Sequence, residues 1–202
     1  NSKKIKDTCF QKKLFAKEPC FSVKDVVCQI KSRHENATLY NQKKWVKIIL
    51  SNLEKKLNLE LKKIKKIFKK KNWPLSFDLE SYIYNHNDLG LQNIILKDNK
   101  YYLIDFEYSG IDSIYKLIND FKLHPANKMN KAKEKIWELN LKKNIKLSKK
   151  TIEISKTLYP LFAIRWIYVI LNPILIKKIK NLKEISKRKE NIDLLLYKLF
   201  NY

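Results

Sequence analysis

Residues 86–107, which read HNDLGLQNIILKDNKYYLIDFE, contain the pattern that decides the fold. Two short apolar runs, residues 93–96 and 101–104, flank the tetrapeptide Lys97-Asp98-Asn99-Lys100, whose Asp-Asn pair is typical of a tight turn. Runs rich in β-branched and aromatic residues around such a turn predict a β-hairpin. This hairpin, over roughly 93–105, is the one β element that the sequence clearly predicts.

The polar residues around this hairpin have a spacing that suits phosphate chemistry. Asp88 and Asn93 lie on a loop that enters the first strand, and Asp105 follows the end of the second strand. Because an antiparallel hairpin brings its two ends together, Asn93 and Asp105 should converge with Asp88 beside them. Two oxygen ligands can hold Mg²⁺ on a nucleotide's phosphates, and a free carboxylate can accept a proton from an attacking hydroxyl.

The order H-x-D-x-x-x-x-N, hairpin, D-F resembles the catalytic signature of the protein-kinase-like superfamily. Residues 86–88 together with residues 104–108 are similar to the aminoglycoside phosphotransferase and choline/ethanolamine kinase branch, in which Glu107 replaces the glycine of D-F-G. The segment from Gly110 to Phe121 adds to this likeness. The resemblance is specific over residues 82–125 and undetectable over residues 1–20.

The resemblance implies roles for three of these residues. Asp88 would be the catalytic base or would orient the acceptor hydroxyl, while Asn93 and Asp105 would be the Mg²⁺ ligands. ATP would be the phosphoryl donor, and the acceptor would be a small molecule with a hydroxyl group, such as choline, an aminoglycoside or a sugar-like compound.

The same resemblance suggests further site residues. His86 would be a structural member of the catalytic loop that orients Asp88. Glu107 and Asp112 would line the metal or the acceptor site. The competing interpretation is that H-x-D-x-x-x-x-N arose by chance in a chain rich in Asn and Asp, but the correctly spaced hairpin and D-F-E argue against chance.

The net charge of +24 would ordinarily suggest a nucleic-acid or membrane partner. The basic residues are nearly all lysines, however, and arginine occurs only at Arg33, Arg165 and Arg188, although arginine is the preferred reader of bases and phosphates. Many of the lysines recur on the polar faces of predicted amphipathic helices. The sequence therefore disfavours a dedicated nucleic-acid-binding role.

Outside the hairpin the chain is predicted to be helical, which makes the fold class mainly α with one β-hairpin (α+β). Residues 1–20 are predicted to be a connector, and residues 21–202 a kinase-like C-terminal, catalytic lobe. Ser22 caps a first helix, a second helix begins near Gln42, and a third covers about 61–70 before Pro74. Nothing before residue 82 has several strands or a glycine-rich loop, so the N-terminal nucleotide-binding lobe is expected to be absent and ATP binding weak.

The stretch 158–176 is the most apolar part of the chain. Pro160, Arg165 and Pro173 interrupt it, so a buried core helix, broken near Pro173, is predicted in preference to a membrane span. The odd number of cysteines, without C-x-x-C spacing, favours a reducing compartment and a cytoplasmic location.

Two classes of function remain open from the sequence. The first is an ATP-dependent phosphotransferase, or its catalytic lobe, acting on the hydroxyl of a small molecule. The alternative is a degenerate kinase lobe that serves as a binding or scaffold module for an acidic partner or a nucleic acid.

Overall fold

The computed structural model describes residues 14–40, 43–176, 179 and 181–201. Its α-helices and strands are, in chain order, α2 (Val23–Thr38), α3 (Lys44–Lys71), β1 (Tyr82–Asn85), β2 (Ile94–Lys97), β3 (Lys100–Leu103), β4 (Gly110–Ser113), α4 (Ile114–Leu123), α5 (Lys131–Ile145), α6 (Lys149–Leu175) and α7 (Leu182–Phe200). The predicted fold class, mainly α with a small β component, is confirmed.

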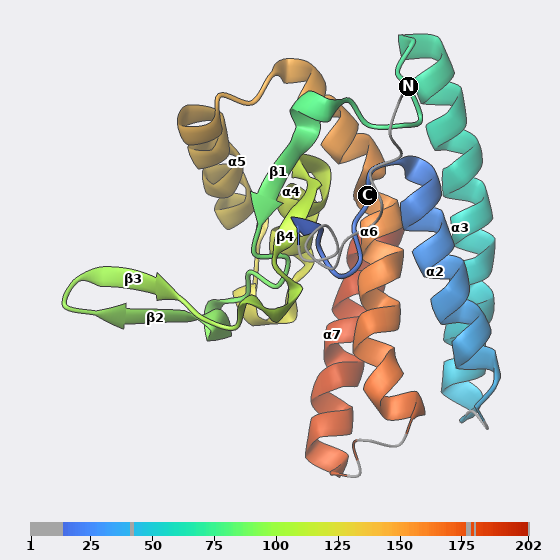
Figure 1. Ribbon diagram of the computed structural model, residues 1–202. Helices are drawn as coiled ribbons and strands as arrows, with labels where there is room; N and C mark the ends of the chain where they lie inside the picture. The colour runs from blue at the N-terminus through green and yellow to red at the C-terminus, as the bar shows by residue number, and fades with distance from the viewer. Residues whose placement is uncertain (1–13, 41–42, 177–178, 180, 202) are drawn as a thin grey trace, which may run out of the picture.

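Helix α6 is the centre of the hydrophobic core. It packs against the long helices α2, α3 and α7, which Figure 1 shows beside it, and against the shorter α4. Its fully buried side chains include Leu161, Phe162, Ile164 and Ile167. The most apolar window of α6 has the length and hydropathy of a membrane-crossing helix, but 78% of that window is buried inside the protein. Such burial favours a core helix.

The predicted hairpin is confirmed. Strands β2 and β3 pair antiparallel, with Ile94 opposite Leu103 and Lys97 opposite Lys100. Asp98 and Asn99 form the turn with φ of 50° and 56°, a left-handed conformation that Asp and Asn adopt more readily than most residues. The hairpin projects away from the helices (Figure 1).

A second antiparallel sheet was not predicted. Strand β1 pairs with β4, with Tyr82 opposite Ser113 and Asn85 opposite Gly110. The loop that carries Asp88 and the hairpin both lie between its two strands in the sequence, so the sheet holds the ends of residues 86–109 together. The strands are short, and their partners lie far apart in the sequence.

One predicted helix boundary was wrong, and another was confirmed. The two helices expected from about 42 to 70 are one continuous 28-residue helix, α3, because Leu57 and Glu60 continue its buried face and no Gly or Pro interrupts it. Helix α6 continues through Pro160 and ends at Leu175, close to Pro173, where a break was predicted. Pro160 removes one backbone donor, and the burial of its neighbours Tyr159 and Leu161 outweighs that loss.

The segment before α2 packs onto the fold. Residues 1–13 of the predicted connector lie outside the described residues. Residues 14–20 lie beside β4 in space, and the Ala16 backbone N–H donates to the Ile111 carbonyl at 3.1 Å. Gly110 allows this contact: it has φ of 155°, and a Cβ there would lie 2.3 Å from the Ala16 nitrogen.

Candidate active site

The loop between β1 and β2 holds Asp88 through Asn93. The Asn93 Nδ2 group donates to the backbone oxygen and to Oδ2 of Asp88, both at 2.9 Å. Asn93 is buried, whereas 29% of the Asp88 side chain is exposed. The predicted proximity of these two residues is confirmed. Because Asn93 uses its nitrogen for Asp88, its Oδ1 is left as an acceptor, and none of the described residues donates a hydrogen bond to it.

His124 is the second partner of Asp88, and sequence analysis missed it. Its Nε2 lies 3.3 Å from Asp88 Oδ1, and its Nδ1 accepts the Ala126 N–H at 3.2 Å, so the neutral ring carries its proton on Nε2. The hydrogen bond from His124 is the largest cause that lowers the pKa of Asp88, burial opposes it, and the Asn93 amide adds to it. Asp88 is therefore ionised at neutral pH.

Close packing explains the glycine of this loop. A Cβ at Gly90 would lie 2.4 Å from Cε1 of His124 and 2.2 Å from Oε1 of Gln92. Asn127 closes the same loop from η4 (Pro125–Asn127): its Oδ1 accepts the Leu91 N–H at 2.9 Å, and its Nδ2 donates to the Leu89 carbonyl at 3.1 Å. The segment after α4 thus determines the shape of the Asp88 loop.

The two ends of the hairpin meet at this loop, as predicted. The Ile104 N–H donates to the Asn93 carbonyl at 3.0 Å, and His86 Nε2 donates to the Ile104 carbonyl at 2.7 Å. The His86 ring also contacts Phe106, with ring centroids 4.8 Å apart. His86 therefore ties the loop that carries Asp88 to the residues on both sides of Asp105.

Asp105 has a left-handed backbone conformation. Its φ and ψ are both 64°, a region that Asp adopts more readily than most residues. Its side chain is exposed, and no described residue is hydrogen-bonded or ion-paired to its carboxylate. Asp105 and the Oδ1 of Asn93 are hard oxygen donors of the kind that Mg²⁺ prefers. Among the described residues no group of three or more His, Cys, Asp or Glu side chains forms a metal site by itself.

The other two predicted site residues have partners of their own. Glu107 is 56% exposed and lies 3.8 Å from Lys17. Asp112 is fully buried: its Oδ1 accepts the backbone N–H groups of Cys20 at 2.8 Å and Ser113 at 2.7 Å, and its Oδ2 lies 2.7 Å from Lys116 Nζ. The structure thus places Asp112 beneath the loop rather than on an open surface.

Lys116 links this buried pair to the loop. Besides Asp112, its ammonium group donates to the Glu18 carbonyl at 3.0 Å and to Oδ1 of Asn87 at 3.2 Å. Asn87 directly precedes Asp88 and has φ of 63°. Three acceptors thus use all three ammonium hydrogens of Lys116. The hydrogen bond to Asn87 holds this neighbour of Asp88 in its left-handed conformation.

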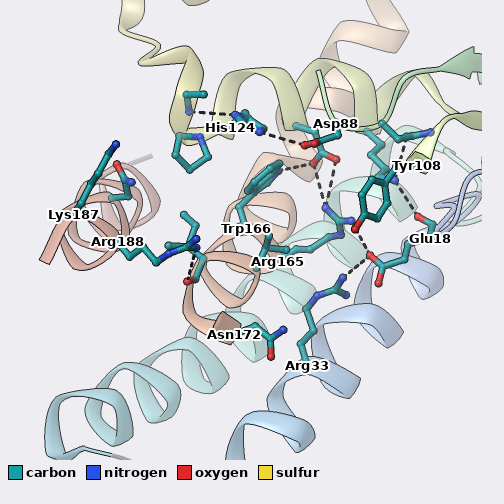
Figure 2. A pocket seen from close by; sticks show the side chains of 18 of the residues that line it. Glu18, Arg33, Asp88, Tyr108, His124, Arg165, Trp166, Asn172, Lys187 and Arg188 are labelled. Carbon is teal, nitrogen blue, oxygen red and sulfur yellow. Dashed lines mark hydrogen bonds and ion pairs between the residues drawn. The ribbon is translucent and has the colours of Figure 1, made fainter. Parts of the chain in front are cut away.

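A large cavity opens beside Asp88. It has a volume of about 770 Å³, which is within the range of small-molecule sites. Figure 2 shows side chains from the N-terminal segment, the Asp88 loop, α6 and α7 around it. Its walls include Arg33, Asp120, Arg165 and Trp166 besides Asp88 and His124.

Comparison with known proteins assigns no family: no family model and no curated protein matches the chain. The kinase-like interpretation therefore depends on the residues and on the site geometry.

Proposed function

We propose that this chain is the catalytic lobe of a phosphotransferase that moves the γ-phosphoryl group of ATP to a hydroxyl group of a small molecule. The observation that carries the proposal is the position of Asp88. This ionised carboxylate is held by Asn93 and His124 at the wall of a cavity of about 770 Å³. Asp105, with its exposed carboxylate, follows the strand that ends beside the same loop.

Asp88 would act on the acceptor. A hydroxyl of the bound molecule donates a hydrogen bond to Asp88, which aligns its oxygen with the γ-phosphorus. As the new P–O bond forms and the bond to the β–γ bridging oxygen breaks, the hydroxyl proton passes to Asp88 and ADP leaves with the electron pair. Because the pKa of Asp88 is lowered, its main contribution is to orient the hydroxyl, and it takes the proton late in the transfer.

The metal would be held by the two oxygen donors. Asn93 Oδ1 and the Asp105 carboxylate are the groups that would bind Mg²⁺, which neutralises charge on the phosphates when it is bound. His86 would keep these donors in register, because it joins the Asp88 loop to the backbone of Ile104. The hairpin that precedes Asp105 also exposes Tyr101 and Leu96, which are opposite each other on its two strands and offer an apolar surface for stacking of a nucleotide base.

The test measures phosphoryl transfer by the natural full-length protein. Transfer from γ-labelled ATP would be assayed with amino-alcohols, aminoglycosides, sugars and sugar phosphates as acceptors. Asp88→Asn should lower turnover by about 10²- to 10⁴-fold, the usual contribution of a positioned acid–base group. The control is Asp98→Asn, the same chemical change in the exposed hairpin turn, which should leave turnover unchanged.

Two results would contradict the proposal. One is transfer that is equally fast with Asp88→Asn. The other is the absence of transfer to every acceptor class while the protein remains folded by circular dichroism.

A further inference from the structure

The cavity has two chemically different ends. In Figure 2, Lys187 and Arg188 of α7 lie at one end, whereas Glu18 and Tyr108 lie at the other. Asp88 lies toward the Tyr108 end. An acceptor whose hydroxyl contacts Asp88 would therefore extend toward α7.

The carboxylates between these ends are already paired. Glu18 is hydrogen-bonded to Arg33 and lies 3.2 Å from Arg165. Asp120 accepts the Trp166 indole N–H at 2.7 Å and lies 3.4 Å from Arg165. Burial alone would lower the pKa of Arg165, but the neighbouring carboxylates, Asp120 first, keep it raised and the guanidinium charged. These acids therefore offer little unpaired negative charge to a cationic substrate.

The aromatic residues of the wall are also engaged. The ammonium group of Lys17 lies 4.6 Å from the centroid of the Tyr108 ring, where a quaternary ammonium would otherwise bind. Trp166 packs edge-to-face with His124, with centroids 5.0 Å apart, and is almost fully buried. Apart from Asp88, the described residues of the wall thus offer neither an unpaired carboxylate nor an open aromatic face to bind choline or an aminoglycoside.

Two lysines of the cavity wall, in contrast, have no carboxylate partner in the part of the chain that the structure describes. Among the described residues, neither Lys187 nor Lys128, which both line the cavity, is paired with a carboxylate. Arg188 is paired with Glu184 at 3.2 Å. Both lysines are exposed, so an anion could reach them from the cavity without breaking an existing ion pair.

We infer that the acceptor carries an anionic group, a phosphate or a carboxylate, which the unpaired lysines of the cavity wall, Lys187 of α7 and Lys128, bind while its hydroxyl lies against Asp88. The orientation of the hydroxyl depends on the proposed phosphotransferase function, but the anion site is defined by its own charges. Cationic acceptors are disfavoured because they would meet two unpaired lysines of the wall, and because the carboxylates of the wall other than Asp88 are already paired with arginines.

The test is direct binding without ATP. Isothermal titration calorimetry would compare glycerol 3-phosphate and D-glycerate, which carry a hydroxyl and either anion, with uncharged glycerol and cationic choline. We expect at least one of the two anions to bind about tenfold more tightly than glycerol and choline, which corresponds to about 1.4 kcal/mol. The two anionic probes distinguish a phosphate-bearing from a carboxylate-bearing acceptor.

Matched variants locate the anion. Lys187→Gln should weaken binding of the preferred anion about fivefold, the upper range for an exposed charge pair. Lys183→Gln removes the same charge from an exposed position of α7 that does not line the cavity, and it should have no comparable effect.

Several outcomes would overturn the inference: no binding of either anion, choline binding as tightly as the anions, or equal effects of the two lysine variants. Displacement of the anion by MgATP would also overturn it, because the lysines would then bind the donor's phosphates. Anion binding with no Asp88-dependent transfer would support the anion site and contradict the phosphotransferase proposal. Transfer to choline without anion binding would support the phosphotransferase proposal and contradict the anion site.

Discussion

Replacing Lys116 by methionine should destabilise the protein strongly, because it leaves a buried carboxylate without its counter-charge. Lys116 and Asp112 are 3% and 0% exposed and lie 2.7 Å apart. Removing one partner of a buried ion pair typically costs about 3–5 kcal/mol of unfolding free energy. In a protein of this size, where 1 kcal/mol shifts Tm by about 2–4 °C, Lys116→Met should lower Tm by about 6–20 °C.

The double variant Lys116→Met/Asp112→Asn tests the cause. The amide oxygen that the second substitution introduces would still accept the N–H groups of Cys20 and Ser113, but the orphaned charge would be gone. The double variant should therefore be more stable than Lys116→Met alone by about 1 kcal/mol or more, the cost of an uncompensated buried charge. Lys150→Met serves as the control, because Lys150 and its partner Asp78 are about half exposed and should contribute at most about 1 kcal/mol.

The assay is urea unfolding followed by tryptophan fluorescence, with the free energy obtained from the transition midpoint at constant slope. A loss of stability in Lys116→Met no larger than that in Lys150→Met would refute the role assigned to the buried pair. A double variant no more stable than Lys116→Met would refute it too, since the loss would then come from packing rather than from charge.

Two further predictions concern the site. His124→Gln should raise the pKa of Asp88 toward its ordinary value of 3.8, as measured by NMR titration of the Asp88 carboxyl. Because the pKa of Asp88 is lowered in the folded state, the ionised carboxylate stabilises the fold fully at pH values above its unfolded-state pKa, and this stabilisation is lost as pH falls through the folded-state pKa. In His124→Gln this acid-dependent loss of stability should shrink. An unchanged titration of Asp88 would exclude His124 as the cause of the lowered pKa. Asp105→Ala should weaken binding of MgATP to the full-length protein about tenfold or more while leaving the urea midpoint nearly unchanged, because it removes an exposed charged ligand; equal MgATP affinity with and without this carboxylate would remove Asp105 from the metal site.

The sequence by itself determined the elements whose signals are local. Helical periodicity with a capping serine predicted α2, and an Asp-Asn turn between apolar runs predicted the β2–β3 hairpin. The closeness of Asp88 and Asn93 also followed, because five residues on a tight loop leave these side chains little room to separate. In each case the interacting groups are near neighbours in the chain, so spacing and residue type restrict the geometry.

Only the tertiary structure decided the contacts between distant segments. His124 and Asn127 meet the Asp88 loop because α4 packs under the β1–β4 sheet, and no local pattern marks either residue. Lys187 lines the cavity because α7 packs against α6. From the sequence alone it is indistinguishable from the other lysines on the polar faces of the helices. Such contacts depend on which helix faces pack against each other. In another arrangement of the same helices, the same residues would be polar groups on the surface.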